Sequence, residues 1–251
     1  MRLIKIGLGL CTLLILCNCN NSSSTEPNKK PVSTKKVLPD LDPNRYNVGF
    51  LIMDGTYNTE FTAPYDIYQH TIFRDSIKAM NVFTIANTDT PITTFEGLKI
   101  LPDFNYVTDS IPRIDILVIP SAEHHLDSDL ENEQLLNFVK RVDRQAMYMI
   151  SHCDGAFILA KAGLLNNSVS TTFPSDIDTM REMFPQLDVR KEVLFVHDGK
   201  YITSAGGAKS FEASLYLAEL LYGKAIADDL AKGLVIDWNL EAVPHLIIPS
   251  E

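Results

Sequence analysis

The feature that most constrains the fold is a strand joined directly to a helix at residues 146–160, which read AMYMISHCDGAFILA. An apolar run typical of a buried strand ends at Cys153, and a helix-spaced apolar pattern begins straight after it. Ser151 and Gly155 supply the small residues that so sharp a turn needs, as in the nucleophile elbow of α/β enzymes. The sulfur then lies at a helix N-terminus, where unpaired N–H groups favour thiolate. The segment predicts a reactive, partly exposed cysteine of low pKa; the alternative is a buried cysteine that acts as a small hydrophobe.

Strand and helix patterns alternate along the rest of the chain. Strands are predicted at 46–53, 82–86 and 114–120, hairpins at 92–101 and 194–204, and helices at 60–73, 130–142, 209–222 and 224–234. This alternation predicts an α/β fold with a doubly wound, mostly parallel sheet and helices on both faces, as in flavodoxin. Ligands of such sheets bind at the carboxyl ends of the strands, where Cys153 is expected to lie.

The N-terminus differs in composition from the rest of the chain. Its first twenty residues resemble a secretory signal, with Arg2 and Lys5 before an apolar core too short to span a bilayer. Cys17 and Cys19 each end a stretch that resembles the lipobox of bacterial lipoproteins. Cys19 is favoured for lipidation, and a plain secretory signal is the alternative. We expect a signal peptide at 1–19, a flexible polar tether at 20–43, one domain at 44–238 and a C-terminal tail at 239–251. The protein would then be lipid-anchored in the bacterial cell envelope, on the periplasmic or surface side.

Composition and charge limit the partners. The formal net charge of −10 argues against nucleic acid, whose binding needs clustered Lys and Arg. After the tether, Cys153 is the one remaining cysteine, so the domain cannot form an internal disulfide. The neighbouring His124 and His125 lack the spacing of metal ligands on one helical face, so no metal site is expected. No cofactor is expected either.

Four stretches in this order resemble the ThiJ/PfpI superfamily, which has the class I glutamine amidotransferase-like fold. The resemblance covers Tyr46 to Trp238, in the branch that contains isonitrile hydratases and the sensor domains of some transcription regulators. It is carried by Glu60-Phe61-Thr62-Ala63-Pro64-Tyr65-Asp66, by Gly97-Leu98-Lys99-Ile100-Leu101-Pro102-Asp103, by the cysteine elbow running on to Ala162-Gly163-Leu164-Leu165, and by Thr203-Ser204-Ala205-Gly206-Gly207. The resemblance implies a small-molecule substrate or ligand and a homodimer.

The resemblance also implies roles for residues around the cysteine. Glu60 matches an acidic residue that hydrogen-bonds the sulfur, and it could transfer a proton if its pKa is raised; the alternative is a solvated acid at a helix start. The backbone N–H of Asp154 is one candidate oxyanion donor. A second would come from the loop at Ser121-Ala122, where relatives usually carry two glycines, so this donor depends on the loop's dihedral angles.

The chain departs from its relatives at Phe173. Many relatives have a histidine after the Thr-Thr pair at this point, so a Cys–His pair from this position is excluded. His124 or His125 could replace it in the pocket, although solvated loop histidines are the alternative. His152 precedes the cysteine on a strand, so its ring should point away from the sulfur.

Three functions remain open at this stage. The first is an enzyme in which Cys153 attacks a small electrophile and Glu60 carries the proton, in the hydration or hydrolysis of an isonitrile, reactive carbonyl or amide. The second is a binding or sensing domain without turnover. The third is a redox-sensing thiol.

Overall fold

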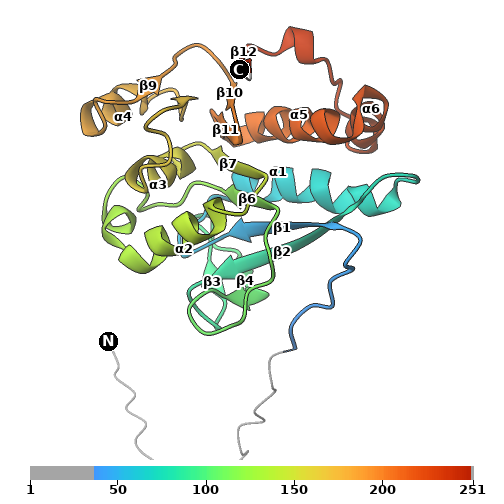
Figure 1. The fold of residues 1–251 in the computed structure, drawn as a ribbon, viewed down its shortest axis with the longest axis horizontal. Coiled ribbons are helices and arrows are strands. Elements are labelled where there is room, and N and C mark those ends of the chain that lie inside the picture. Colours follow the sequence, from blue (N-terminus) through green and yellow to red (C-terminus); the bar gives the residue numbers. More distant parts are fainter. Residues whose placement is uncertain (1–36, 250–251) are drawn as a thin grey trace, which may run out of the picture. The chain divides into compact units, whose positions relative to one another are not determined.

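The computed structural model describes residues 37–249 of the chain, so Cys17 and Cys19 lie outside the described residues. The described part is built on an eight-stranded sheet of order β12-β10-β11-β7-β6-β1-β2-β5, with helices packed on both faces (Figure 1). All neighbouring strands of this sheet run parallel except β10 and β11, which form an antiparallel pair. The expected doubly wound α/β fold is confirmed.

The central strands of the sheet are buried along most of their length. Its strands are β1 (Tyr46–Leu51), β2 (Met80–Ala86), β5 (Phe104–Asn105), β6 (Ile116–Ile119), β7 (Tyr148–His152), β10 (Phe195–Asp198), β11 (Tyr201–Ser204) and β12 (His245–Ile247). Every residue of β6 is buried, as are the last four of β1 and of β7. Such continuous apolar runs are typical of parallel strands that are covered on both faces.

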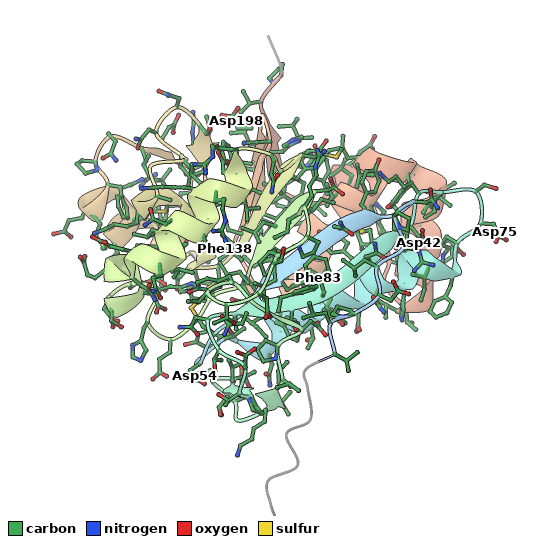
Figure 2. All side chains as sticks on the ribbon, turned by 60° about the horizontal axis from the view of Figure 1, so that its bottom comes forward. Asp42, Asp54, Asp75, Phe83, Phe138 and Asp198 are labelled. Atoms are coloured by element: carbon green, nitrogen blue, oxygen red, sulfur yellow. The ribbon has the colours of Figure 1, made fainter. Side chains whose placement is uncertain are left out.

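The helices divide between two apolar cores. They are α1 (Asn58–Gln69), α2 (Glu133–Asp143), α3 (Gly155–Lys161), α4 (Ile177–Met183), α5 (Ser210–Tyr222) and α6 (Lys224–Gly233). One core joins α2, α3 and α4 to the sheet, and the other joins α1, α5 and α6 to it. Figure 2 shows Phe83 of β2 and Phe138 of α2 inside the first of these cores, where both rings are buried.

The topology brings three chain segments to one edge of the sheet. Strands β1, β6 and β7 are parallel neighbours, with Val48 opposite Ile116 and Val118 opposite Ile150. The segments that follow their carboxyl ends therefore meet at the same edge. These segments hold the start of α1, the loop after Pro120, and the cysteine elbow.

The two expected hairpins are confirmed. Strands β3 (Ile92–Thr93) and β4 (Lys99–Ile100) pair antiparallel, and β10 turns into β11. The sequence patterns missed α4 and the short parallel pair of β8 (Val169–Ser170) and β9 (Asp188–Val189). Within 239–251, expected to be a tail, β12 instead pairs with β10 and completes the sheet. Among the described residues, no helix is long and apolar enough to cross a bilayer.

Candidate active site

The cysteine elbow is a strained turn that glycine makes possible. Cys153 has φ of +52°, in the left-handed region that residues with a Cβ rarely occupy. Such a backbone conformation costs about 1–3 kcal/mol and is maintained by the surrounding structure. A Cβ on Gly155 would lie 2.1 Å from the carbonyl oxygen of Ile119, so α3 can begin against the end of β6 only with glycine there. The prediction that this turn needs a small residue is confirmed at Gly155.

A second glycine fits directly against the cysteine. A Cβ on Gly206 would lie 2.3 Å from the Cβ of Cys153, and Gly206 has φ of +76°. The N–H of Cys153 donates to the carbonyl of Ser204 at 2.9 Å, which ties the elbow to the end of β11. These contacts explain why the Ser204-Ala205-Gly206-Gly207 segment has a glycine beside the cysteine.

The Glu60 carboxyl lies against the sulfur and is held from two sides. Its side chain is 5% exposed in the first turn of α1, so the alternative of a solvated acid is wrong. One oxygen accepts the N–H of Ser121 at 3.0 Å, and the other accepts the N–H of Gly207 at 3.1 Å. The Cys153 thiol is close enough to this carboxyl to lower its pKa by hydrogen bonding. Burial raises the pKa of Glu60 against these hydrogen bonds, which meets the condition for its expected role.

A second carboxyl, which the sequence reasoning did not single out, flanks the thiol. The Asp154 side chain is 9% exposed and accepts the hydroxyl of Thr172 at 3.2 Å, and the Cys153 thiol can donate to it as well. Burial, followed by the charge of Asp176, raises the pKa of Asp154 to about 7. The same Thr172 hydroxyl contacts the carbonyl of Cys153 at 3.0 Å.

The expected low pKa and partial exposure of Cys153 are wrong for this geometry. The residue is 6% exposed, and burial raises its thiol pKa well above the usual range, with the charges of Glu60 and Asp154 acting in the same direction. The backbone N–H of Asp154 and the hydroxyl of Ser121 favour the thiolate, but they do not offset burial. Burial and the two neighbouring carboxyls therefore favour the protonated thiol.

In the loop expected to supply the second oxyanion donor, the backbone N–H groups already donate hydrogen bonds within the protein. The N–H of Ser121 donates to Glu60, and the N–H of Ala122 donates to Nδ1 of His125 at 3.2 Å. The replacement of two glycines by Ser121 and Ala122 is therefore accompanied by a loop whose amides point to internal partners. The amide of Asp154 faces the sulfur, as expected of a donor close to the nucleophile.

The histidines take three different environments. His125 is fully buried, so the expectation that it is a solvent-exposed loop histidine is wrong. Burial lowers its pKa to about 3. Its Nδ1 accepts from Ala122 and its Nε2 lies 3.8 Å from an Asp129 carboxylate oxygen, so the neutral ring supports the loop. His124 lies at the surface with 54% of its side chain exposed, as expected of a solvated loop histidine. The His152 ring contacts the Ser204 hydroxyl at 2.8 Å.

Aromatic residues lie at the surface next to the site. Phe173 follows Thr172, whose hydroxyl contacts the elbow, and is 39% exposed. The sequence reasoning missed Tyr57, a half-buried residue whose ring stacks on the exposed ring of Phe95 with centroids 4.5 Å apart. Burial raises the pKa of Tyr57, and the next largest cause is the neighbouring Cys153.

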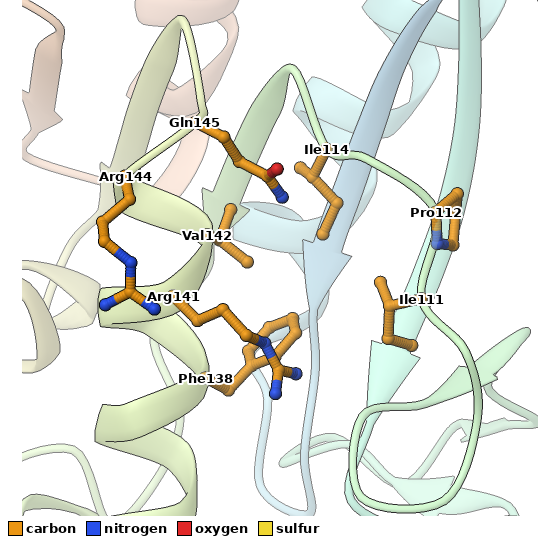
Figure 3. A pocket seen from close by; sticks show the side chains of 8 residues that line it. All are labelled: Ile111, Pro112, Ile114, Phe138, Arg141, Val142, Arg144 and Gln145. Carbon is orange, nitrogen blue, oxygen red and sulfur yellow. The ribbon is translucent and has the colours of Figure 1, made fainter.

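A separate pocket of about 350 Å³ lies away from this group (Figure 3). It is lined by residues before β6 and at the end of α2, among them Ile114 and Val142, and Figure 3 shows Arg141 and Arg144 beside it. These residues precede the amino ends of β6 and β7, so the pocket is at the opposite edge of the sheet from Cys153. In residues 37–249, no three His, Cys, Asp or Glu side chains gather closely enough to hold a metal ion.

The fold and the site together define an α/β protein with a cysteine elbow and a carboxyl partner. The chain belongs to the DJ-1/PfpI family, whose sequence pattern it matches over residues 46–220. It is 27% identical to the isonitrile hydratase of Pseudomonas putida over 176 residues, which are 70% of this chain and 72% of that enzyme. It is 34% identical to the transcriptional regulator CdhR of Pseudomonas aeruginosa over 102 residues, which are 41% of this chain and 30% of that regulator. The structure of a ThiJ/PfpI family protein from Pseudomonas syringae superposes with a TM-score of 0.68 at 22% identity, covering 82% of this chain and 84% of the other.

Proposed function

We propose that this chain is an enzyme in which the Cys153 thiol adds to the electrophilic carbon of a small molecule, and that isonitrile hydration is the first reaction to test. The observation that carries the proposal is the Cys153 thiol held at a strained elbow within hydrogen-bonding reach of the Glu60 carboxyl. The similarity to an isonitrile hydratase over 72% of that enzyme selects the substrate class. Reactive carbonyls and amides are further electrophiles that the same thiol could attack.

The proposed reaction conserves atoms in three steps. The sulfur bonds to the isonitrile carbon while its proton passes through Glu60 to that carbon, which gives a thioimidate. Water then adds to the carbon, and one of its protons passes to the nitrogen. The carbon–sulfur bond finally breaks, the hydroxyl proton returns to sulfur, and an N-substituted formamide leaves. Glu60 serves as base and then as acid, for which a raised pKa is suited.

Turnover measurements test this proposal. Wild type, Cys153→Ser and Glu60→Gln are assayed on a panel of isonitriles and α-oxoaldehydes with aliphatic and aromatic substituents. We expect Cys153→Ser to be inactive and Glu60→Gln to lose on the order of 10²–10⁴-fold, the usual contribution of a positioned acid–base group. A wild-type protein that turns over no member of the panel, or a Cys153→Ser variant that keeps full activity, would refute the enzyme.

Phe173 bears on substrate range and on pH dependence. An apolar ring in place of a histidine favours apolar substrates and removes imidazole from proton transfer at that position. We expect Phe173→His to broaden the substrate range and to add an ionisation to the pH profile. His125→Ala tests whether the buried histidine transfers the proton. If this variant loses turnover while its melting temperature is unchanged, His125 has the role proposed for Glu60.

A binding or sensing domain without turnover is the second candidate. It is favoured by the engaged amides of Ser121 and Ala122, which would have to be freed to act on substrate, and by the similarity to a segment of a transcriptional regulator. Saturable ligand binding by calorimetry, with no product formed, would favour this candidate. The redox-sensing thiol is less favoured, because oxidation requires an accessible thiolate and Cys153 is buried with a raised pKa.

We also propose that the protein is exported and lipid-anchored. The support is the sequence alone: a charged start, a short apolar core, lipobox-like stretches at Cys17 and Cys19, and a polar tether. Mass spectrometry of the mature N-terminus is expected to find a lipidated Cys19, or Cys17 as the second choice. A mature protein that starts at another residue would overturn the anchor.

A further inference from the structure

The hydroxyl of Ser121 is a buried polar group that pairs with no nitrogen or oxygen atom of the described residues, although it lies close enough to the Cys153 sulfur to lower the thiol pKa. Ser121 is fully buried. An unpaired buried hydroxyl costs about 1–3 kcal/mol. Such groups are rare in folded proteins, and each one calls for a reason.

The backbone of Ser121 fixes this hydroxyl beside the sulfur. Its N–H donates to Glu60 at 3.0 Å, and its carbonyl accepts the N–H of Tyr57 at 3.0 Å. The hydroxyl faces Cys153, whose thiolate it favours. Two backbone hydrogen bonds therefore fix Ser121 with its hydroxyl directed at the sulfur.

The backbone amides of this loop, unlike the Ser121 hydroxyl, already donate to nitrogen or oxygen acceptors. The amides of Ser121 and Ala122 donate to Glu60 and His125. A substrate atom that needs a donor on this side of the sulfur would have to displace one of these bonds or accept from the Ser121 hydroxyl. Accepting from the hydroxyl displaces no nitrogen or oxygen partner, and the Cys153 sulfur gives up its interaction with this hydroxyl when it bonds to carbon.

We propose that the Ser121 hydroxyl donates to the nitrogen or oxygen atom that is bonded to the carbon attacked by Cys153. This inference rests on the proposed function and deepens it, because it names the donor that replaces the backbone amides of the loop. The substrate class is a small electrophile whose reacting carbon carries a hydrogen-bond acceptor. For an isonitrile, that atom is the nitrogen. When water adds to the thioimidate carbon, the electron pair of the C=N bond moves to this nitrogen, and the Ser121 hydroxyl stabilises the charge that develops there.

The step assigned to Ser121 has a readout besides turnover, which is the accumulation of a covalent adduct. Ser121→Ala should slow hydration of the thioimidate more than its formation. Intact mass spectrometry of the variant with excess isonitrile should then show a protein adduct with the added mass of one isonitrile. We expect kcat to fall on the order of 100-fold, the usual effect of removing one oxyanion-hole donor.

Two further variants control for packing. Ser121→Thr keeps the hydroxyl and is expected to retain turnover within several-fold. Ser210→Ala removes another fully buried hydroxyl that pairs with no nitrogen or oxygen atom of the described residues, at the start of α5, and is expected to leave kcat unchanged. Thermal melts of all variants separate a loss of fold from a loss of chemistry.

The outcomes distinguish the two proposals. Wild-type protein that neither turns over nor forms an adduct with any of the electrophiles would refute the proposed function. Wild-type turnover matched by a folded Ser121→Ala variant, with no adduct, would refute the role of Ser121 and leave the enzyme standing. If Ser121→Ala does not fold, Ser121→Thr decides, because loss of turnover in a folded variant that keeps the hydroxyl contradicts the inference.

Discussion

At the scale of single residues, three neighbouring acidic groups compete for protons, and this competition determines the protonation of the site. The single proton of the Cys153 thiol can be donated to Glu60 or to Asp154, and each carboxylate makes the thiolate less favourable. Burial acts on all three in the same direction, by penalising the charged form. Burial and the neighbouring carboxyls favour a proton on sulfur in the resting site, and this proton passes to a carboxyl when sulfur attacks. This is the reverse of the free thiolate that the elbow pattern alone predicts.

Alkylation of Cys153 should report this competition. We expect the iodoacetamide rate of the wild type to reach its midpoint above the pH of about 8.5 that is typical of free cysteine. Asp154→Asn and Glu60→Gln should each lower that midpoint, because each removes a negative charge beside the sulfur. Asp178→Asn, which removes an exposed carboxylate paired with Arg181, is the control and should leave it unchanged. A wild-type midpoint below that of free cysteine would contradict the buried thiol.

The Asp154 carboxyl should also appear in the pH dependence of stability. Its pKa is raised from 3.8 to about 7 in the folded protein, so between these values the native state binds more protons than the unfolded state. Stability from this group is therefore lost as pH rises through that window, and the penalty is complete above pH 7. Asp154→Asn should match wild type near pH 4 and exceed it above pH 7, by an amount on the order of a few kcal/mol. Denaturant melts across this range measure it, and equal stability of the two proteins at pH 8 would contradict it.

At the scale of elements, the cysteine elbow depends on close backbone contacts. Gly206 and its neighbour Gly207 both have positive φ, +76° and +55°. A Cβ on Gly206 would meet Cys153 at 2.3 Å, whereas a Cβ on Gly207 would meet nothing within 4 Å. The two positions thus share backbone strain and differ in available space.

This pair gives a matched test of the elbow. Gly207→Ala should cost about 1–2 kcal/mol from the left-handed conformation alone. Gly206→Ala should cost a further 1–3 kcal/mol or more, roughly the cost of overpacking, and should change the alkylation rate of Cys153 as the elbow shifts. Chemical denaturation measures both variants. Equal losses of stability would show that the contact between Gly206 and Cys153 is easily relieved.

The elements themselves differ in how far the sequence predicts them. Long apolar runs such as β1 and β7 and the periodic helices α2 and α5 could be predicted, because burial fixes their patterns over many residues. The two-residue strands β8 and β9 and the seven-residue α4 could not, since so few residues carry no readable period. β12 was missed for a similar reason: three residues form it, and its pairing with β10 is a tertiary contact.

At the scale of the whole molecule, the site is assembled from segments far apart in the chain. Glu60 bonds Gly207 across 147 residues and Ser121 across 61. The elbow and Glu60 could be predicted, because strand order brings their loops to one edge. The second carboxyl, the buried His125 and the engaged loop amides could not, since their environments depend on what the folded neighbours cover. The low pKa expected for Cys153 failed for that reason.

The C-terminal strand links the far edge of the sheet to this site. Pro244, just before β12, accepts the N–H of Leu194; the carbonyl of Leu194 in turn accepts the N–H of Ala205, which precedes Gly206. The ring of His245 stacks on Phe195 with centroids 5.1 Å apart. The segment after residue 242 should therefore support both the edge of the sheet and the elbow contact.

Truncation after Ala242 tests this link. Removing β12 leaves β10 as an unpaired edge and frees Leu194, so we expect the melting temperature to fall by at least about 5 °C, at about 2–4 °C per kcal/mol for a domain of this size. The alkylation rate of Cys153 should rise, because the support of Ala205 and Gly206 is weakened. His245→Ala removes the ring stacking and keeps the backbone pairing, so its loss should stay near 1 kcal/mol. A truncated protein that melts within a degree of wild type and labels at the same rate would show that β12 contributes neither to stability nor to the site.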